Sequence, residues 1–568
     1  MYRGLPQVGT GLHRRRPSPN TGQRAEPQER AVDQALSTSD SAMMAQEPAP
    51  RRGLVGLALI VLAAGAVRLA FSSSISGNDD LAVAGCALRM LNGMSILQEG
   101  HYCARLGLTV PLAAVFGVAG TGSSQLSLLP ALASLGAMLV AWGLGAQLLG
   151  RSVGLAAAAV IGLFPMDVEY AGLVFPDVPQ GVLVASAGLC VLKAGRASRG
   201  RADAWAVAAG ALWAWAYYVK LDAFMFAPVL LVAVLSGLVR WRHAVVMGTV
   251  AVGLIGIELV TYGVLAGDPL RHLHLESAGS NEVLASGMDY RDLMTFPKSM
   301  FLVPYETGIA YLLWLLAVGT ALTTRSRPLV LLVAWCLIWQ AWLMFGADPL
   351  SGFRLKPQLG RYLLSWEVPM AVLVGWFWIR LLAWRRVVAG GVATVAVAAL
   401  LVLGPFNQLS FKAAQATRLA VGAALRNSWF PLYPDVQSIG IVQFLLHGRP
   451  EAARVFAVQR HDFLKGVTTF EPIPKAPAWL LVNETYARQL QVRNLVHPID
   501  PASFGLTPTK VFQVDRPASA LSYVALDVLG AVAGLVPGPF GRKAQGTMTE
   551  LVRPGDAVVW RLDRPDVR

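Results

Sequence analysis

The sequence predicts an α-helical polytopic membrane protein with about eleven crossings, one non-crossing interfacial helix and a small C-terminal α/β domain. Three observations predict this fold class. Only 14% of the 568 residues are charged, whereas soluble domains carry about 25%. Apolar runs of about 20 residues recur along the chain, and each could cross a hydrocarbon core of about 30 Å. Short basic clusters separate these runs, as membrane topology requires.

The chain before the first apolar run is polar and rich in Pro, Arg, Gln and Ser. It has no apolar periodicity, so we expect residues 1–52 to form a disordered cytoplasmic tail. The first apolar run starts only after Arg51-Arg52. This position predicts an uncleaved membrane anchor and not a signal peptide.

Eleven apolar runs predict a transmembrane region over residues 53–404. A further apolar stretch, 105–119, is too short for a crossing and is typical of an interfacial or re-entrant helix. The predicted crossings are 53–72, 126–149, 153–172, 178–194, 204–219, 221–239, 243–266, 301–322, 328–346, 363–383 and 387–404.

The basic clusters set the orientation of the chain. They all fall on the cytoplasmic side if 105–119 does not cross, and nearly all would fall outside if it did. With a cytoplasmic N-terminus, eleven crossings place the C-terminus outside. The clusters are Arg51-Arg52, Arg151, Lys193 with Arg196, Arg199 and Arg201, Arg240 with Arg242, Arg325 with Arg327, and Arg385-Arg386.

Residues 405–568 are therefore expected to form an extracytoplasmic C-terminal domain. Segment 434–447 has a helical pattern, and short β-rich runs alternate with such helix-like segments. This mixture predicts a small α/β domain. The predicted strands are Arg454–Val458, Trp479–Val482, Lys510–Val514 and Ala557–Leu562.

The net charge of +14 could suggest a nucleic-acid-binding protein. The basic residues form no single stripe, so we expect membrane lipids and no nucleic acid as partners. The four cysteines contain no CxxC pair, which argues against a thiolate metal site. Cys86 and Cys103 share one predicted external loop, where two free thiols are the default and a disulfide is the alternative.

Two acidic turns lie on the predicted outer face, each next to an apolar span. The first holds Asp79 and Asp80, and the second holds Asp177. A carboxylate beside an apolar wall would have a raised pKa, which suits a general base. The alternative for all three is a helix cap, because Asp favours this position and Pro179 suits a first helical turn.

The last external loop, 347–362, is basic although it faces outside. Arg354, Lys356 and Arg361 would suit an anionic phosphate at the lipid interface. Lys220, in an external turn, is a second phosphate candidate. The alternatives are a solvated loop near lipid headgroups for the arginines and lysine of 347–362, and snorkelling for Lys220.

A third external loop, 267–300, contains His272 and His274. Their i, i+2 spacing places both rings on one face only in an extended chain. A metal site would need further ligands, and none can be paired with these histidines from the sequence. Metal ligation by His272 and His274 is therefore an open alternative.

Six short motifs follow one another in order within residues 53–404. They are Asn78-Asp79-Asp80 with a helix ending at Arg89–Gly93, Arg105-Leu106-Gly107 through Phe116-Gly117, Leu148-Leu149-Gly150-Arg151, Phe164-Pro165 with Pro176-Asp177, Tyr218-Val219-Lys220, and Gly360-Arg361-Tyr362 with Pro369. This series resembles the GT-C glycosyltransferases, specifically the family 39-like (PMT-type) and aminoarabinose-transferase-like enzymes that use polyprenyl-phosphate sugars.

The resemblance implies a glycosyltransferase of the cell membrane. It would move a sugar, usually with inversion, from a polyprenyl-phosphate donor to a lipid, glycan or protein acceptor on the extracytoplasmic face. Asp79 would be the catalytic base, with Asp80 and Asp177 in support. The donor phosphate would be held by Lys220 and Arg361, with help from Arg105.

The sequence departs from the family pattern at two places. Family members often carry Glu where this chain has Asp80, and some carry Glu-Lys-Pro near Arg105-Leu106-Gly107. The second departure leaves metal and phosphate roles there open, and His101 is a nearby substitute ligand. A divalent metal is thus an open cofactor. The alternative functions are a multi-pass transporter or flippase and a non-catalytic membrane scaffold.

Overall fold

The computed structural model describes most of the chain from residue 50 onward. Residues 1–49 of the predicted tail lie outside the described residues, so that prediction is not tested. The described residues are 50–568 without 78, 98, 286–292, 302–303, 325, 349–353, 356–357, 428, 463–466, 474–475, 486–498, 536, 553–556 and 565–568.

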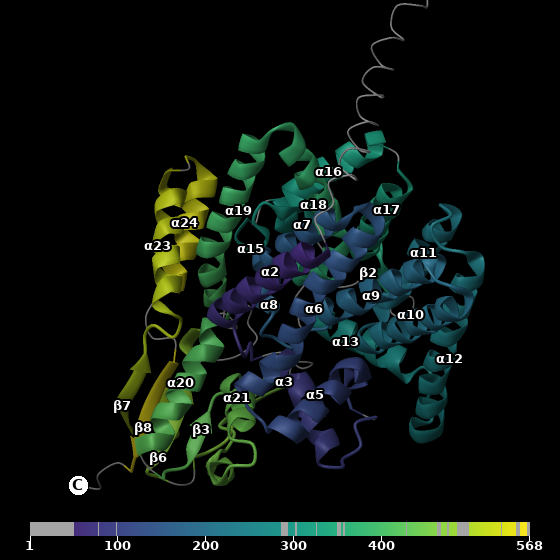
Figure 1. Ribbon diagram of the computed structural model, residues 1–568. Coiled ribbons are helices and arrows are strands. Elements are labelled where there is room, and N and C mark those ends of the chain that lie inside the picture. Colours follow the sequence, from purple (N-terminus) through teal and green to yellow (C-terminus); the bar gives the residue numbers. More distant parts are fainter. Residues whose placement is uncertain are drawn as a thin grey trace, which may run out of the picture. The chain divides into compact units, whose positions relative to one another are not determined.

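Helices make up nearly all of the described chain up to residue 407 (Figure 1). They are α2 (Pro50–Phe71), α3 (Asp79–Leu91), α4 (His101–Ala104), α5 (Leu106–Ala119), α6 (Ser123–Leu149), α7 (Arg151–Gly162), α8 (Pro165–Tyr170), α9 (Asp177–Arg196), α10 (Arg199–Val219), η1 (Leu221–Met225), α11 (Phe226–Leu235), α12 (Trp241–Ala266), α13 (Arg271–Ala285), α14 (Thr295–Phe301), α15 (Pro304–Thr307), α16 (Ala310–Thr324), α17 (Arg327–Phe345), η3 (Gly360–Trp366), α18 (Glu367–Trp384) and α19 (Arg386–Asn407). A two-stranded ladder, β1 (Ala347–Asp348) with β2 (Arg354–Leu355), precedes η3.

Within the described residues, seven helical segments are long and apolar enough to cross a membrane. The chain is therefore a multi-pass α-helical membrane protein, as predicted, while the figure of eleven crossings stays a prediction. The seven are Gly53–Phe71, Ser123–Leu149, Asp177–Arg196, Trp241–Ala266, Arg327–Phe345, Gly360–Trp384 and Arg386–Arg426. Shorter apolar helices are Leu106–Ala119, Arg151–Gly162, Leu221–Leu235, Ala310–Thr324 and Ala520–Leu535.

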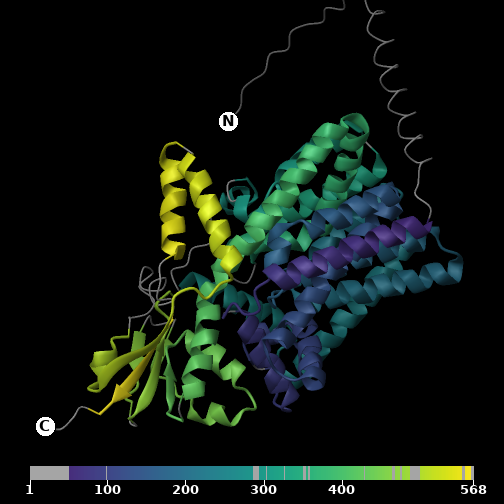
Figure 2. The ribbon, with the colours of Figure 1, turned by 60° about the vertical axis from the view of Figure 1, so that its left-hand side comes forward.

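Two of the predicted crossings are not continuous helices. The run 153–172 is divided between α7 and α8, because Pro165 has no N–H to continue the hydrogen-bond ladder. In the run 301–322, the apolar helix α16 starts only at Ala310, after a turn in which Gly308 has a φ of 59°. The stretch predicted not to cross forms α5, whose 14 residues span about 21 Å. Figures 1 and 2 show α5 beside α3.

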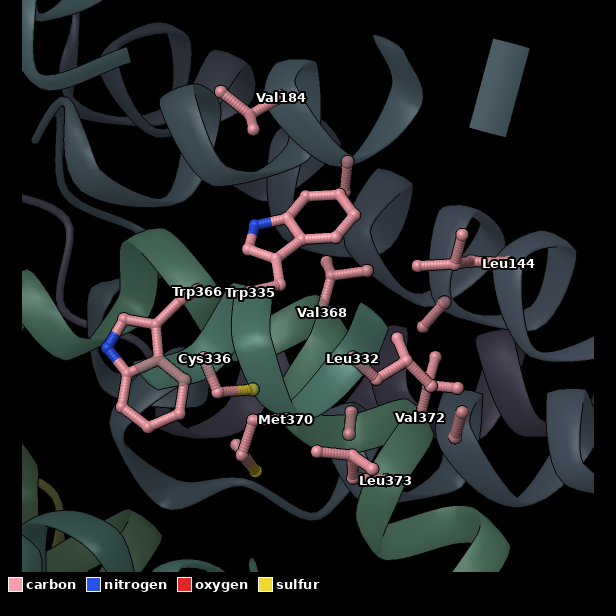
Figure 3. Packing of buried hydrophobic residues seen from close by; sticks show 14 of the residues in the cluster. Leu144, Val184, Leu332, Trp335, Cys336, Trp366, Val368, Met370, Val372 and Leu373 are labelled. Atoms are coloured by element: carbon pink, nitrogen blue, oxygen red, sulfur yellow. The ribbon is translucent and has the colours of Figure 1, made fainter. Parts of the chain in front are cut away.

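Buried aromatic and aliphatic side chains of α9, α17 and α18 form the centre of the helical region (Figure 3). Trp335 of α17 approaches α9 closely, because a Cβ at Gly188 would lie only 2.7 Å from its ring. Trp366, at the end of η3, is fully buried in the same cluster. This packing fixes η3, the element that carries Arg361, against the ends of α9 and α17.

A four-stranded mixed sheet with flanking helices follows α19 (Figure 2). Its strand order is β3-β6-β8-β7, with β3 and β6 parallel and the other pairs antiparallel. Helices α20 and α21 pack on it, and α23 packs beside α19. The elements are η4 (Gln408–Phe411), α20 (Lys412–Asn427), β3 (Leu432–Pro434), α21 (Ser438–Leu445), η5 (Pro450–Arg454), β4 (Gln459–Asp462), β5 (Val467–Phe470), β6 (Ala478–Val482), η6 (Pro501–Phe504), β7 (Thr507–Val514), α23 (Ala520–Leu535), α24 (Pro539–Val552) and β8 (Ala557–Asp563).

The predicted α/β pattern of this part is confirmed in three strands and one helix: β6, β7, β8 and α21. The predicted strand Arg454–Val458 is wrong. Pro450 starts the 3-10 helix η5, and Val455 makes only an isolated bridge to Leu432. The helix α19 continues past the predicted domain boundary at 404 and ends at Asn407.

Candidate active site

The first acidic turn sends its two carboxylates in different directions. Asp79 and Asp80 open α3, and consecutive residues of a helix lie about 100° apart. Asp80 is buried and accepts hydrogen bonds from the backbone N–H (2.7 Å) and the hydroxyl (2.6 Å) of Ser76. Its carboxylate therefore fixes the loop before α3.

Asp79 faces the residues that the sequence predicted for the donor phosphate. Its carboxylate accepts a hydrogen bond from Arg361 Nη2 at 2.6 Å and from the hydroxyl of Tyr102 at 2.8 Å. Arg361 lies 282 residues further along the chain, in η3. No sequence pattern indicated Tyr102, because a single tyrosine in a short helix forms no spacing pattern.

A disulfide holds Tyr102 in place over Asp79. Cys86 of α3 and Cys103 of α4 are bonded, with their Cα atoms 5.2 Å apart. The default expectation of two free thiols is therefore wrong. The bond ties α4 to the helix that begins with Asp79, so the Tyr102 hydroxyl is positioned by a covalent cross-link.

The second acidic turn joins the same cluster. Asp177, in the first turn of α9, pairs with Lys220 Nζ at 2.9 Å and lies 3.4 Å from Arg361 Nε. Arg361 thus bridges the two acidic turns. Four residues that the sequence placed on four separate external turns, Asp79, Asp177, Lys220 and Arg361, lie in one continuous ion-pair network.

Aromatic rings cover the cations of this network. Lys220 Nζ lies 3.7 Å from the centre of the Tyr362 ring, and the Arg361 guanidinium lies 4.1 Å from that of Phe175. A second carboxylate, Asp222, lies 3.4 Å from Lys220 Nζ and accepts a hydrogen bond from an indole N–H. The rings and the carboxylates together orient the two cations.

Two atoms of the network have no hydrogen bond although both are buried. They are Arg361 Nε and Asp177 Oδ2, which face each other at 3.4 Å. A guanidinium has five N–H donors, so Arg361 keeps donor capacity beyond its bond to Asp79. The arrangement can therefore accept an anion without first losing all of its internal bonds.

Arg105 lies at the edge of the network. It forms a two-pronged pair with Glu276 of α13, at 2.8 and 3.4 Å, and its guanidinium lies 5.5 Å from the centre of the Tyr102 ring. Burial would raise the pKa of Glu276, but Arg105 outweighs it and lowers that pKa to about 2. The predicted phosphate contact of Arg105 would thus require it to share its charge with Glu276.

The pKa of Asp79 moves opposite to the sequence-based expectation. Burial raises it, but Arg361, the Tyr102 hydroxyl and Arg105 together lower it below its ordinary value. The expectation considered only the apolar wall and missed the cations. Asp79 is therefore ionised in this arrangement. Its strength as a base depends on whether Arg361 stays paired with it.

The three histidines considered as metal ligands do not come together. His272 Nδ1 lies 3.0 Å from Glu258, His274 Nδ1 lies 2.7 Å from Asp268, and the His101 ring packs on Tyr102. Among the described residues, no group of three or more His, Cys, Asp or Glu side chains could hold a metal ion.

The acidic turns themselves were the other potential source of metal ligands. The carboxylates of Asp79 and Asp177 are occupied by Arg361 and Lys220. Within the described residues, these two carboxylates therefore face cationic side chains and form no group of metal ligands.

Not all of the predicted basic loop can be placed. Lys356 lies outside the described residues, as does Asn78 of the first acidic motif. Arg354 pairs with Asp348 in the backbone register of β1 and β2. Of the three basic residues predicted in this loop, Arg361 is the one that the structure places in the candidate site.

One protein-family model matches the chain. The segment 110–262 matches the model described as dolichyl-phosphate-mannose-protein mannosyltransferase. This segment runs from α5 to α12 and contains Asp177, Lys220 and Asp222. Among curated proteins, none matches the chain.

Solved structures share the fold. The oligosaccharyltransferase of Archaeoglobus fulgidus in its apo form is 12% identical, with a TM-score of 0.52 over 90% of this chain and 88% of that one. The same enzyme in complex with zinc and sulfate is also 12% identical, with a TM-score of 0.52 over 89% of this chain and 88% of that one. ArnT from Cupriavidus metallidurans, bound to undecaprenyl phosphate, is 13% identical, with a TM-score of 0.48 over 78% of this chain and 95% of that one. The family match over residues 110–262 and the fold shared with the oligosaccharyltransferase agree with the GT-C resemblance seen in the sequence.

Proposed function

We propose that this protein transfers a hexose or pentose from a polyprenyl-phosphate donor to a hydroxyl group of a lipid, glycan or protein acceptor on the extracytoplasmic face of the cell membrane. One observation carries the proposal. Arg361 joins the two acidic turns, at 2.6 Å from Asp79 and 3.4 Å from Asp177, with Lys220 on the far side of Asp177. A base and two phosphate-binding cations thus lie within one network.

The reaction is a single displacement at the anomeric carbon. The acceptor oxygen forms the new glycosidic bond while its proton passes to Asp79. The bond from the anomeric carbon to the phosphate oxygen breaks, and its electron pair leaves with polyprenyl phosphate. Lys220 and Arg361 stabilise the charge that develops on this leaving group, and attack from the opposite face inverts the configuration.

Donor binding would also activate the base. In the present arrangement Arg361 neutralises Asp79 and lowers its pKa. A donor phosphate that takes up the spare N–H groups of Arg361 would draw the guanidinium charge away from Asp79. The pKa of Asp79 would then rise, because its burial would be less compensated. Deprotonation of the acceptor would therefore be efficient only when the donor is in place.

The orientation of the chain supports an extracytoplasmic reaction. Cys86 of α3 and Cys103 of α4, both before α5, form a disulfide, and disulfides persist in oxidising compartments. The basic clusters lie at the opposite ends of the predicted crossings. A cytoplasmic N-terminus and an external C-terminal domain over 405–568 follow from this orientation. The donor class agrees with the description of the matched family, which names a dolichyl-phosphate sugar and a protein acceptor.

The test uses the purified full-length chain in lipid nanodiscs with a panel of polyprenyl-phosphate sugars labelled in the sugar. The expected result is release of polyprenyl phosphate with at least one donor. If the labelled lipid crosses the bilayer of proteoliposomes intact, with no cleavage, the transporter is the correct function. Absence of cleavage for every donor, with and without hydroxyl acceptors, rejects the proposal.

A further inference from the structure

A groove at the junction of α5, α10 and α12 lies outside the ion-pair network. It has a volume of about 460 Å³, within the range of sites for small ligands. Its walls are almost entirely apolar and aromatic, including Val110, Pro111, Trp215 and Tyr218. Val110 and Trp215 are exposed at its rim, so the groove opens at the surface of the helical region, beside the candidate membrane span α12.

One carboxylate interrupts the apolar wall. Glu258 of α12 lines the groove and is 5% exposed. One of its oxygens lies 3.0 Å from His272 Nδ1, whereas its second oxygen has no hydrogen-bond partner. His272 Nε2 is also buried without a partner. Buried polar atoms are normally hydrogen-bonded, so a free carboxylate oxygen in an apolar groove indicates that a donor group of a ligand binds there.

The charge of Glu258 selects among lipids. An anionic headgroup beside a buried carboxylate would be repelled, and the repulsion is strong in a medium of low dielectric constant. A neutral hydroxyl headgroup can instead donate a hydrogen bond to the free oxygen. The donor polyprenyl phosphate is therefore a poor occupant for the groove at Glu258, while a lipid alcohol fits its walls and its one acceptor.

The groove leads toward the proposed catalytic base. Leu106 and Gly107 line it, and they directly follow Arg105, whose guanidinium lies beside the Tyr102 ring. The indole N–H of Trp215 donates to the carbonyl of Gly107 at 3.0 Å, which fixes α10 against the start of α5. The groove thus begins at the residue after Arg105, which lies beside the Tyr102 ring of the network.

We propose that this groove binds the acceptor, a membrane lipid alcohol in which one headgroup hydroxyl donates a hydrogen bond to Glu258 and a second hydroxyl is the one that reacts at Asp79. The term acceptor rests on the proposed glycosyltransferase function. Binding of a lipid alcohol at Glu258 does not rest on that function, so it can be tested by itself. The acceptor class of the enzyme would accordingly be a lipid and not a glycan or a protein.

Binding is measured by photo-crosslinking to the full-length chain in nanodiscs. The probes are a diacylglycerol with a photoreactive acyl chain and the phosphatidic acid with the same chains. The diacylglycerol should label peptides around 106–111 and 257–262, at least about tenfold more than phosphatidic acid does. Equal labelling by both probes, or labelling elsewhere only, would show a general lipid surface and overturn the proposal.

Two variants and one control sharpen the test. Glu258→Gln removes the charge but keeps the shape, and should abolish the preference for diacylglycerol. Ala211→Trp fills the groove from an exposed position and should reduce labelling about tenfold without touching Glu258. Asp268→Asn alters a second carboxylate–histidine pair of the same region, exposed and outside the groove, and should change nothing. Unchanged labelling in both groove variants overturns the proposal.

The two proposals fail separately. Cleavage of the sugar donor by water, without any acceptor, reports on the catalytic network alone. If the donor is cleaved but the labelling does not change in Glu258→Gln, the acceptor groove is rejected and the glycosyltransferase function stands. Charge-dependent labelling without cleavage of any donor rejects the glycosyltransferase and keeps the lipid-binding groove.

Discussion

Two arginine–aspartate pairs connect distant segments of this chain, and they differ in how completely the arginine is used. In the candidate active site, Arg361 binds Asp79, and the two side chains are 17% and 20% exposed. Among the membrane helices, Arg68 binds Asp167, and these side chains are 3% and 0% exposed. The same two side-chain types thus form an open pair at one place and a closed pair at the other.

The closed pair has further partners within the protein. Arg68 donates to the hydroxyl of Ser134 at 2.5 Å and to the carbonyls of Ala64 and Ile161 at 3.2 and 3.3 Å. The Ser134 hydroxyl in turn donates to Asp167. All three nitrogens of the guanidinium donate hydrogen bonds, so this pair holds α2, α6 and α8 together.

The open pair retains unused capacity, because Arg361 Nε has no hydrogen bond in the described part of the chain. A closed pair contributes to stability, and an open pair can exchange partners with a ligand. The comparison therefore assigns stability to Arg68 and function to Arg361. Four substitutions would break or sharpen this assignment.

The largest effect is expected for Asp79→Asn. The amide keeps the shape and can still contact Arg361 and Tyr102, but it cannot take a proton from the acceptor. A general base contributes about 100- to 10,000-fold to a rate, so we expect kcat to fall by about 1,000-fold. The measurement is release of polyprenyl phosphate by purified protein. Glu99→Gln, an exposed carboxylate paired with Arg89 in the same external region, is the control and should retain the rate of the wild type.

Arg68→Leu should instead reduce stability. Removal of one partner of a buried ion pair costs about 3–5 kcal/mol, because Asp167 would remain charged and unpaired. The thermal unfolding midpoint in detergent should fall clearly, while the apparent KM for the donor in the folded fraction stays unchanged. A normal midpoint would show that the closed pair does not fasten the helices.

Arg361→Ala should show the opposite pattern. A hydrogen bond to a charged group is worth about 1.5–3 kcal/mol, so the KM for the donor should rise by about 10- to 100-fold. The KM for the acceptor and the unfolding midpoint should change little. Arg361→Lys keeps the charge but loses the guanidinium that reaches both Asp79 and Asp177, so its donor KM should lie between those of the wild type and Arg361→Ala. An unchanged donor KM in Arg361→Ala would remove this residue from the phosphate site.

Much of the membrane part was predictable, because a long apolar run can hardly be anything other than a helix in lipid. The breaks at Pro165 and Gly308 were missed, because the mean hydropathy of a run of about 20 residues outweighs a single Pro or Gly within it. In the C-terminal region, short strands such as β3 and β4 were missed, because runs of three or four residues carry too little periodicity.

The candidate site was predictable in its charged residues and not in their pairing. The charge pattern predicted an external position for Asp79, Asp177, Lys220 and Arg361. Their partners came from segments up to 282 residues away, and no local pattern reports such a distance. This is also why the pKa of Asp79 was expected to rise, since the cations that lower it were not yet in view.

A third ion pair is intermediate in exposure between the open Arg361 pair and the closed Arg68 pair. Its loss should have the smallest effect of the four substitutions. Arg105 and Glu276 are 9% and 21% exposed, and the pKa of Glu276 is lowered from about 4.5 to about 2. A lowered pKa adds stability that is complete above the pKa of the unfolded chain. This contribution should therefore be lost as the pH falls from about 4.5 through about 2. Glu276→Gln should flatten the decline of the unfolding midpoint over this range. If the variant declines as steeply as the wild type, the Arg105–Glu276 pair does not stabilise the fold, and Arg105 belongs with Arg361 among the open residues.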